Sequence, residues 1–289
     1  IGVLSLFAVL ASLILIFNRG AQVGWGSPVV LIMIVVLLIS IPVLFQYQRR
    51  SRRPILDLPL FKTTGYGFGL IVLICHYISL GAIMLLASFY FIDHLGFSAT
   101  KAGAFIMLYS LMRVFIAPFT GYILRFISPW HLSAFGLALI CGSLVWFSFL
   151  SVSGSEASIF IALLLIGIGS GIYEPPNTLT IMSSVPSDRY GTASASIASG
   201  RQLAFALGVA MCGAINAGRE KLYNVGEITQ SDYLSMSFSH ALLACAIFAG
   251  IGLILSFGTG LLTAILINLV ILNTKKGKLK NIKTKKIGY

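Results

Sequence analysis

The stretch IFIALLLIGIGSGIYEPPNTLTIMS, residues 159–183, decides the class of fold. Its only charged residue is Glu174, and the remaining residues are apolar, small or uncharged. About 20 apolar residues are enough to cross the roughly 30 Å hydrocarbon layer of a membrane as a helix. Because every backbone polar group in lipid needs an internal partner, such a span is expected to be helical. The stretch therefore predicts a transmembrane helix that carries one acid.

The rest of the chain repeats this pattern, since 57% of its 289 residues are hydrophobic and only 10% are charged. Breaks at polar, glycine and proline clusters separate the apolar runs. We expect an all-α polytopic membrane protein with eight transmembrane helices. The expected spans are 1–17, 28–48, 68–91, 102–125, 131–152, 157–183, 192–217 and 238–260.

Lysines and arginines are distributed unequally between the two sides of these spans. One side carries fourteen of them, including the loop QYQRRSRRP at 46–54 and the tail NTKKGKLKNIKTKKIGY at 273–289, and the other side carries four. Cytoplasmic loops are enriched in basic residues, so the tail and this loop are predicted to be cytoplasmic. The net charge of +12 is then a topology signal with some attraction to anionic lipid, and no nucleic-acid partner is expected.

Four cysteines lie singly in apolar runs, without a CxxC pattern or a histidine cluster at ligand spacing. Isolated cysteines of this kind usually behave as small core hydrophobes. We therefore expect neither a metal site nor a cofactor. The cysteines are Cys75, Cys141, Cys212 and Cys245.

Away from the ends of the predicted spans, the charged and histidine residues are Arg113, Glu174, Arg201 and His76. A charge near the bilayer centre costs roughly 2.5–3.5 kcal/mol on insertion scales, so these groups should face a cavity or a partner. Counting residues from each span centre places Glu174 about 6 Å and Arg201 about 5 Å to the cytoplasmic side, with His76 at a similar depth and Arg113 central. We therefore expect a shared polar layer.

The sequence around Glu174 also predicts an interrupted helix. Pro175 and Pro176 have no N–H, which frees the carbonyls four residues earlier. Interrupted helices near the midplane are where transporters build binding sites. In GIGSG, Gly167 and Gly171 allow close helix approach or flexing. The polar neighbours expected to contribute to the site are Tyr173, Asn177 and Gln202.

Each of these features has a second, purely structural interpretation. Glu174 could neutralise Arg201 in an ion pair, or it could bind protons or substrate. Arg113 could pair with backbone carbonyls or contact substrate, and His76 could be a packed core residue. Helical spacing fixes the depth of a side chain but leaves open which face of the helix it occupies.

Several stretches resemble the C-terminal part of the fourteen-spanner drug:proton antiporters of the major facilitator superfamily. They are GAQVGWGSP at 20–28, RRPILDLPLFKTTGYGFG at 52–69, RVFIAPFTGYILRF at 113–126 and GIGSGIYEPPN at 167–177, with the pattern GTAS…RQL…LGVA at 191–210. The resemblance covers about 1–257. In such transporters Gly121 and Arg125 belong to a gating loop motif, but its acid is absent from this chain.

The resemblance implies a division into three parts. Residues 1–64 would be a central helix pair with a basic cytoplasmic linker, residues 65–262 the C-terminal six-helix bundle, and residues 263–289 an apolar extension with a lysine-rich cytoplasmic tail. The N-terminal bundle of the family would be missing. Because position 1 is not methionine, we expect a fragment whose partner bundle belongs to the same parent chain or to a separate subunit.

The function expected from this resemblance is proton-coupled efflux of small amphipathic or drug-like compounds by alternating access. The protein would lie in the cytoplasmic membrane of a prokaryote, with protons and a small molecule as its ligands. The alternative is a non-transporting scaffold or half-transporter that pairs with a separate N-terminal half. An enzyme is disfavoured, because no clustered catalytic signature accompanies His76 or Glu174.

Overall fold

The computed structural model describes residues 2–23, 26–50, 58–150, 156–224, 238–258 and 260. These residues form long helices and contain no strand. The long helices are α1 (Gly2–Val23), α2 (Pro28–Arg50), α3 (Thr64–Phe89), α4 (Ala99–Ile123), α5 (Pro129–Leu150), α6 (Glu156–Ser183) and α7 (Tyr190–Asn224). A further helix, Phe238–Gly258, is called the final helix below. Three short helical segments join them: η1 (Leu58–Lys62), η2 (Tyr90–His94) and η3 (Ser187–Arg189).

Seven helices in the described part of the chain are long and apolar enough to cross a membrane. They correspond to the second to eighth predicted spans. The first predicted span falls in α1, whose apolar segment Phe7–Ile16 is shorter than a full membrane crossing. The prediction of an all-helical polytopic membrane protein is therefore confirmed.

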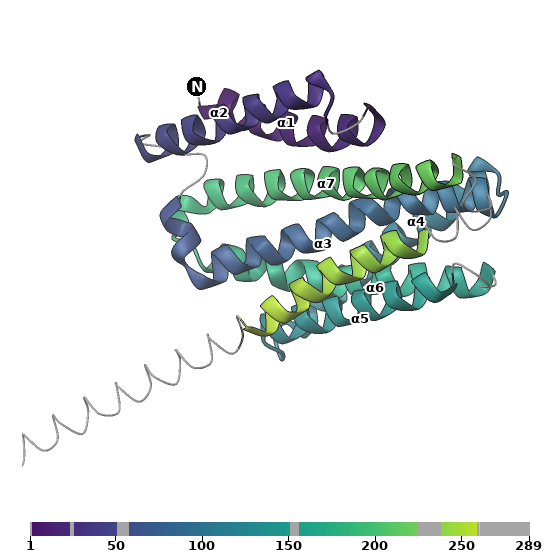
Figure 1. Cartoon of the computed structure of the whole chain (residues 1–289). Coiled ribbons are helices and arrows are strands. Elements are labelled where there is room, and N and C mark those ends of the chain that lie inside the picture. The colour runs from purple at the N-terminus through teal and green to yellow at the C-terminus, as the bar shows by residue number, and fades with distance from the viewer. Residues whose placement is uncertain are drawn as a thin grey trace, which may run out of the picture.

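The helices run roughly side by side along one axis (Figure 1). α1 and α2 form a pair, and α1 contacts α7. α3 contacts α7, α6 and α4, and α6 contacts α4 and α5. The final helix joins α3 and α5, because the Ser79 hydroxyl donates to the Cys245 carbonyl at 2.8 Å and the Cys141 thiol donates to the Ala246 carbonyl at 3.5 Å. α3 is the most deeply buried of the seven candidate membrane helices and packs against α4, α6, α7 and the final helix.

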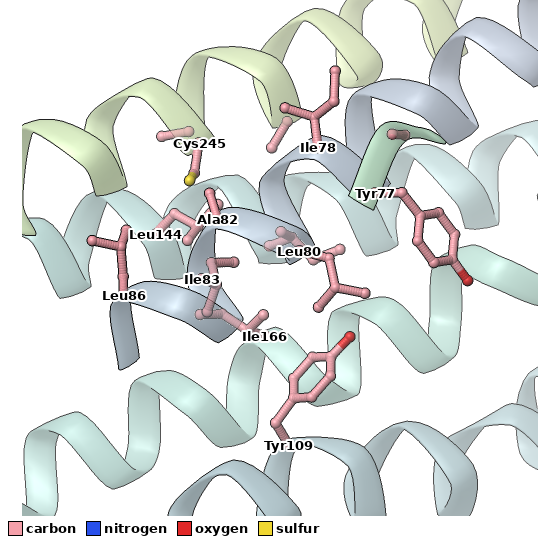
Figure 2. Close-up of a cluster of buried hydrophobic side chains, with 14 of the residues drawn as sticks. Tyr77, Ile78, Leu80, Ala82, Ile83, Leu86, Tyr109, Leu144, Ile166 and Cys245 are labelled. Carbon is pink, nitrogen blue, oxygen red and sulfur yellow. The ribbon is translucent and has the colours of Figure 1, made fainter. Parts of the chain in front are cut away.

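The apolar core is centred on α3. Figure 2 shows Ile83 and Leu86 of α3 among side chains of α5, α6 and the final helix, including Leu144, Ile166 and Cys245. All five are at most 2% exposed. In contrast, α2 exposes most of its apolar side chains, as expected for a helix that faces lipid. Burial around α3 helps to fix the positions of the polar side chains that precede Ile83 and Leu86 on the same helix.

Glycines allow α6 to approach its neighbours closely. A Cβ atom on Gly167 would lie 2.6 Å from the Tyr109 carbonyl oxygen of α4, and one on Gly171 would lie 2.9 Å from the Arg113 carbonyl oxygen. On the opposite face, a Cβ on Gly169 would lie 2.9 Å from the Gly136 carbonyl oxygen of α5. The GIGSG stretch therefore serves helix packing, in the small-residue mode common between membrane helices.

The predicted interruption at Pro175 and Pro176 is wrong, because α6 continues as a helix to Ser183. Pro175 leaves the Gly171 carbonyl without its usual helical donor. That carbonyl accepts a hydrogen bond from the Thr120 hydroxyl of α4 at 3.0 Å, and the same hydroxyl lies 3.1 Å from the Ile116 carbonyl of its own helix. A donor from a neighbouring helix thus compensates for the proline, as membrane helices with proline commonly require.

This compensation predicts a specific dependence between two positions. Thr120→Val should destabilise the fold by about 1 kcal/mol, the usual net contribution of a hydrogen bond. In a Pro175→Ala background the backbone N–H of residue 175 can bond to Gly171, so the same substitution should cost less. Thermal unfolding of the two single variants and the double variant in one detergent measures the coupling. Equal costs of Thr120→Val in both backgrounds would exclude this explanation of the continuous helix.

Residues 51–57 of the predicted basic linker and all of the predicted extension and tail at 263–289 lie outside the described residues. The three-part division and the cytoplasmic location of the C-terminus therefore stay predictions.

Candidate proton and substrate site

Glu174 of α6 contacts side chains from three other helices. The Tyr77 hydroxyl of α3 donates to its Oε1 atom at 2.7 Å. An Arg201 guanidinium nitrogen of α7 lies 2.9 Å from the same oxygen, and Nε of Arg113 in α4 lies 3.6 Å from Oε2. The structure thus brings together three charged residues that the sequence placed at similar depth. The carboxylate joins four helices through two ion pairs and one hydrogen bond.

The site is partly buried and carries excess positive charge. The Glu174 side chain is 17% exposed, and those of Arg113 and Arg201 are each 33% exposed. Two guanidinium groups oppose one carboxylate, so the three residues together carry one net positive charge when all are ionised. Arg201 also contacts the Thr178 hydroxyl at 3.4 Å and lies 5.6 Å from the Tyr77 ring centroid.

The local sequence explains how Arg113 reaches Glu174. Gly171 lies three residues before Glu174, on nearly the same face of α6. Its missing side chain lets the α4 backbone at Arg113 approach α6. Because α4 and α6 are held close at this level, the Arg113 side chain can reach the carboxylate without extending through lipid.

His76 and Tyr173 form a second pair beside the first. They precede Tyr77 and Glu174 in sequence, and their ring centroids lie 4.6 Å apart. His76 is 2% exposed and Tyr173 is 1% exposed. Within the described residues, the two ring nitrogens of His76 and the hydroxyl of Tyr173 have no hydrogen-bond partner. A buried polar group without a partner costs about 1–3 kcal/mol, so this pair needs an explanation.

The other predicted polar residues lie elsewhere or act structurally. Asn177 is buried, and its amide donates to the Gly69 carbonyl of α3 at 3.2 Å, which ties α6 to α3. Gln202 is exposed on α7. Gly121 has open space around it, and Arg125 lies over the Tyr122 ring at 5.6 Å. The structure therefore places neither Gln202 nor the Gly121–Arg125 pair in the Glu174 cluster.

Sequence reasoning missed Tyr77 and Thr178, both of which contact the charged cluster. Tyr77 follows His76 directly, so the same depth count would have placed its hydroxyl in the polar layer. Thr178 lies one helical turn after Glu174 and was hidden among other polar residues of α6. No group of three or more histidine, cysteine or acidic side chains able to hold a metal ion occurs in the described part of the chain.

The arrangement can hold a proton or a polar ligand. Burial disfavours the charge of the carboxylate, whereas the two arginines favour it. Movement of either arginine away from Glu174 would therefore weaken the stabilisation of its charged form. The balance between these two effects depends on contacts that four helices supply.

Comparisons with known proteins agree with this architecture. The family model of the Major Facilitator Superfamily matches residues 1–209. The multidrug resistance protein Stp of Mycobacterium tuberculosis is 24% identical over 216 residues, which are 75% of this chain and 40% of that protein. The lincomycin resistance protein LmrB of Listeria monocytogenes is 24% identical over 245 residues, covering 83% of this chain and 52% of LmrB.

The quinolone resistance protein NorB of Staphylococcus aureus is also 24% identical, over 259 residues that cover 89% of this chain and 53% of NorB. The chain thus spans about half the length of these relatives. The resemblance to drug-exporting transporters noted from the sequence is confirmed by these matches. Since the family model covers well over half of its residues, the chain belongs to the major facilitator superfamily.

Proposed function

We propose that this chain forms the C-terminal part of a proton-coupled exporter of small amphipathic or drug-like compounds, with Glu174 as its proton-binding acid. The observation that carries the proposal is the contact of one partly buried carboxylate with Arg113, Arg201 and Tyr77, each from a different helix. The relatives that are drug resistance proteins support the class of substrate. In this proposal the protein lies in the plasma membrane of a prokaryote with its C-terminus in the cytoplasm.

The proposed mechanism follows from the charge of Glu174. While it is ionised, the carboxylate attracts Arg113 of α4 and Arg201 of α7, which favours one arrangement of these helices. Protonation removes that attraction and leaves two like charges facing each other, so the helices favour a different arrangement. Rocking of this bundle against a second bundle around a midplane site would convert the change into alternating access.

The matched relatives are nearly twice as long as this chain, a ratio that fits two versions of the proposal. In the first version the second bundle belongs to the same polypeptide. In the second version this chain is a half-transporter that assembles with an N-terminal six-helix bundle supplied by another polypeptide. In both versions the six-helix bundle formed by α3 to α7 and the final helix provides one wall of the translocation path, and a second bundle provides the other.

The dependence on a second bundle can be tested in lipid vesicles. Residues 1–289 reconstituted alone should show no pH-driven uptake of a fluorescent cationic dye above protein-free vesicles. Adding an N-terminal bundle, either fused before residue 1 or co-expressed, should restore uptake. Transport by residues 1–289 alone would contradict the proposal that a second bundle is required, and co-purification of the separate bundle without transport would favour the scaffold instead.

A further inference from the structure

The charges of the Glu174 cluster do not balance. Arg113 and Arg201 approach the Glu174 carboxylate to 3.6 Å and 2.9 Å. Glu174 is one of eight acidic residues in the chain, and the other seven lie outside the spans predicted from the sequence. This chain therefore supplies no second acid at the membrane depth of the two arginines. A charge inside a membrane protein is expected to have a partner, so the surplus positive charge indicates a partner that comes from outside this chain.

The hydrogen-bond donors of the two arginines are also in excess. A guanidinium group has five N–H donors. One terminal nitrogen of Arg201 contacts Glu174 and the Thr178 hydroxyl, whereas its Nε atom is buried without a partner among the described residues. Arg113 approaches Glu174 through Nε at a distance longer than a hydrogen bond, and Tyr109 is its other hydrogen-bond partner. Both side chains thus retain N–H groups for a further acceptor.

The two guanidinium groups converge although their helices are not packed together. α4 packs against α6 and α7 packs against α3, and among the described residues α4 and α7 have at most a marginal contact. Both arginine side chains are partly exposed, so an acceptor can reach them. A carboxylate fits the planar guanidinium through parallel N–H bonds. Its single negative charge matches the surplus, whereas a phosphate monoester, with nearly two charges at neutral pH, would exceed it.

We propose that Arg113 and Arg201 bind the carboxylate of the transported compound, so that the site takes amphipathic acids and zwitterions. One such carboxylate makes the cluster neutral while Glu174 is ionised. A cationic dye qualifies as a substrate when it also carries a free carboxylate. The inference deepens the proposed function and rests on it in placing the Glu174 cluster on the translocation path.

Glu174 has a positioning role for this ligand. While it is ionised, its carboxylate holds both guanidinium groups at one place. In the proposed mechanism protonation leaves two like charges that favour separation, so the ligand carboxylate loses one of its arginines and binds less tightly. The arginines must move for this to occur, because at fixed positions the loss of a neighbouring negative charge would tighten the binding of an anion. Release of ligand on proton uptake is what export driven by a proton gradient needs.

The first test measures binding of tritium-labelled 1-naphthylacetate to the whole chain in lipid nanodiscs at pH 7, with empty nanodiscs as the background. This probe is a small amphipathic acid that is ionised at that pH. We expect saturable binding that unlabelled 1-naphthylacetate displaces. 1-Naphthylacetamide has a similar shape but no charge, so it should displace the probe at least about tenfold less well. The comparison needs no variant and is therefore independent of any effect on folding.

Variants then assign the binding to the two arginines. Arg113→Gln and Arg201→Gln should each lower the affinity for 1-naphthylacetate about tenfold, the effect of losing a hydrogen bond to a charged group. Arg125→Gln is the matched control, because Arg125 lies over the Tyr122 ring and outside the cluster. Its affinity should equal that of the wild-type chain. Circular dichroism and size-exclusion chromatography select the variants that are folded.

A further arm distinguishes a ligand carboxylate from an acidic side chain of the second bundle, which would offer the same group. The binding measurement is repeated with an N-terminal bundle fused before residue 1. Retained binding of 1-naphthylacetate supports the ligand. Loss of binding when the bundle is added would assign the counter-charge to a side chain of that bundle and contradict the inference.

Three other results would overturn it: no saturable binding above empty nanodiscs, equal displacement by the acid and the amide, or unchanged affinity in both folded arginine variants. These measurements need no pH gradient, so their outcome is separable from the proposed function. Binding of the acid without pH-driven transport by the assembled protein would contradict the proposed function alone. Transport of a dye by an assembled protein that does not bind the acid would contradict only the inferred substrate class.

Discussion

Glu174→Gln is expected to abolish pH-driven transport by the assembled transporter. Glutamine has nearly the size and shape of glutamate but cannot ionise, so Arg113 and Arg201 face each other without a counter-charge. The attraction that we propose to switch on and off with protonation is then absent in every state. Vesicles carrying the variant with its second bundle should show dye uptake at the level of protein-free vesicles when a pH gradient is applied.

The same variant should also lose stability. Removal of one partner from a fully buried ion pair costs about 3–5 kcal/mol. The three side chains here are 17–33% exposed, so solvent screening should reduce the cost to roughly 1–3 kcal/mol. Glu156→Gln is the matched control, since Glu156 lies at the start of the same helix in an exposed ion pair with Lys101. Undiminished pH-driven uptake by Glu174→Gln would remove this residue from the mechanism.

The second large effect is expected at the crossing of α4 and α6. Gly171→Leu should strongly destabilise the bundle, because a Cβ atom there would lie 2.8 Å from the Ile116 Cβ atom and 2.9 Å from the Arg113 carbonyl oxygen. Neither of these atoms can turn away as the end of a long side chain could. Overpacking typically costs about 1–3 kcal/mol, and a backbone clash that separates two helices should reach or exceed the upper end.

Gly103→Leu gives the same substitution on α4 at a position where no other atom lies within 4 Å of the added Cβ. It should leave the yield and the thermal unfolding midpoint of the detergent-solubilised chain nearly unchanged. Size-exclusion chromatography and circular dichroism would compare the two variants. Equal yield and midpoint for Gly171→Leu and Gly103→Leu would show that the close approach of α4 and α6 is not needed for the fold.

The sequence was sufficient for the helices and for the depth of their charges. A run such as 159–183 is apolar for long enough to span a membrane, and in lipid only a helix satisfies its backbone. Depth follows from residue number multiplied by the helical rise. Helix formation and depth in the membrane can both be worked out for one segment at a time. The sequence therefore predicts that Arg113, Glu174 and Arg201 lie at a similar depth in the membrane. The structure shows that these three residues are in contact.

The sequence could not determine which side of each helix faces the cluster, because that depends on which neighbouring helices pack against it. Gln202 is adjacent to Arg201 in sequence, yet Gln202 is exposed whereas Arg201 contacts Glu174. Tyr77 was overlooked although it contacts Glu174, and the pairing of His76 with Tyr173 depends on how α3 crosses α6.

The continuity of α6 is the clearest case of a property decided by the tertiary structure. By itself, GIYEPPN at 171–177 has the features of a broken helix, since two consecutive prolines remove two helical hydrogen bonds. The Thr120 hydroxyl reaches the freed Gly171 carbonyl only because the missing side chain at Gly171 allows α4 to approach. The sequence thus determined that a charged, proline-containing segment lies in the membrane. The packing of α4, α3 and α7 decided that this segment stays helical and that its carboxylate meets two arginines.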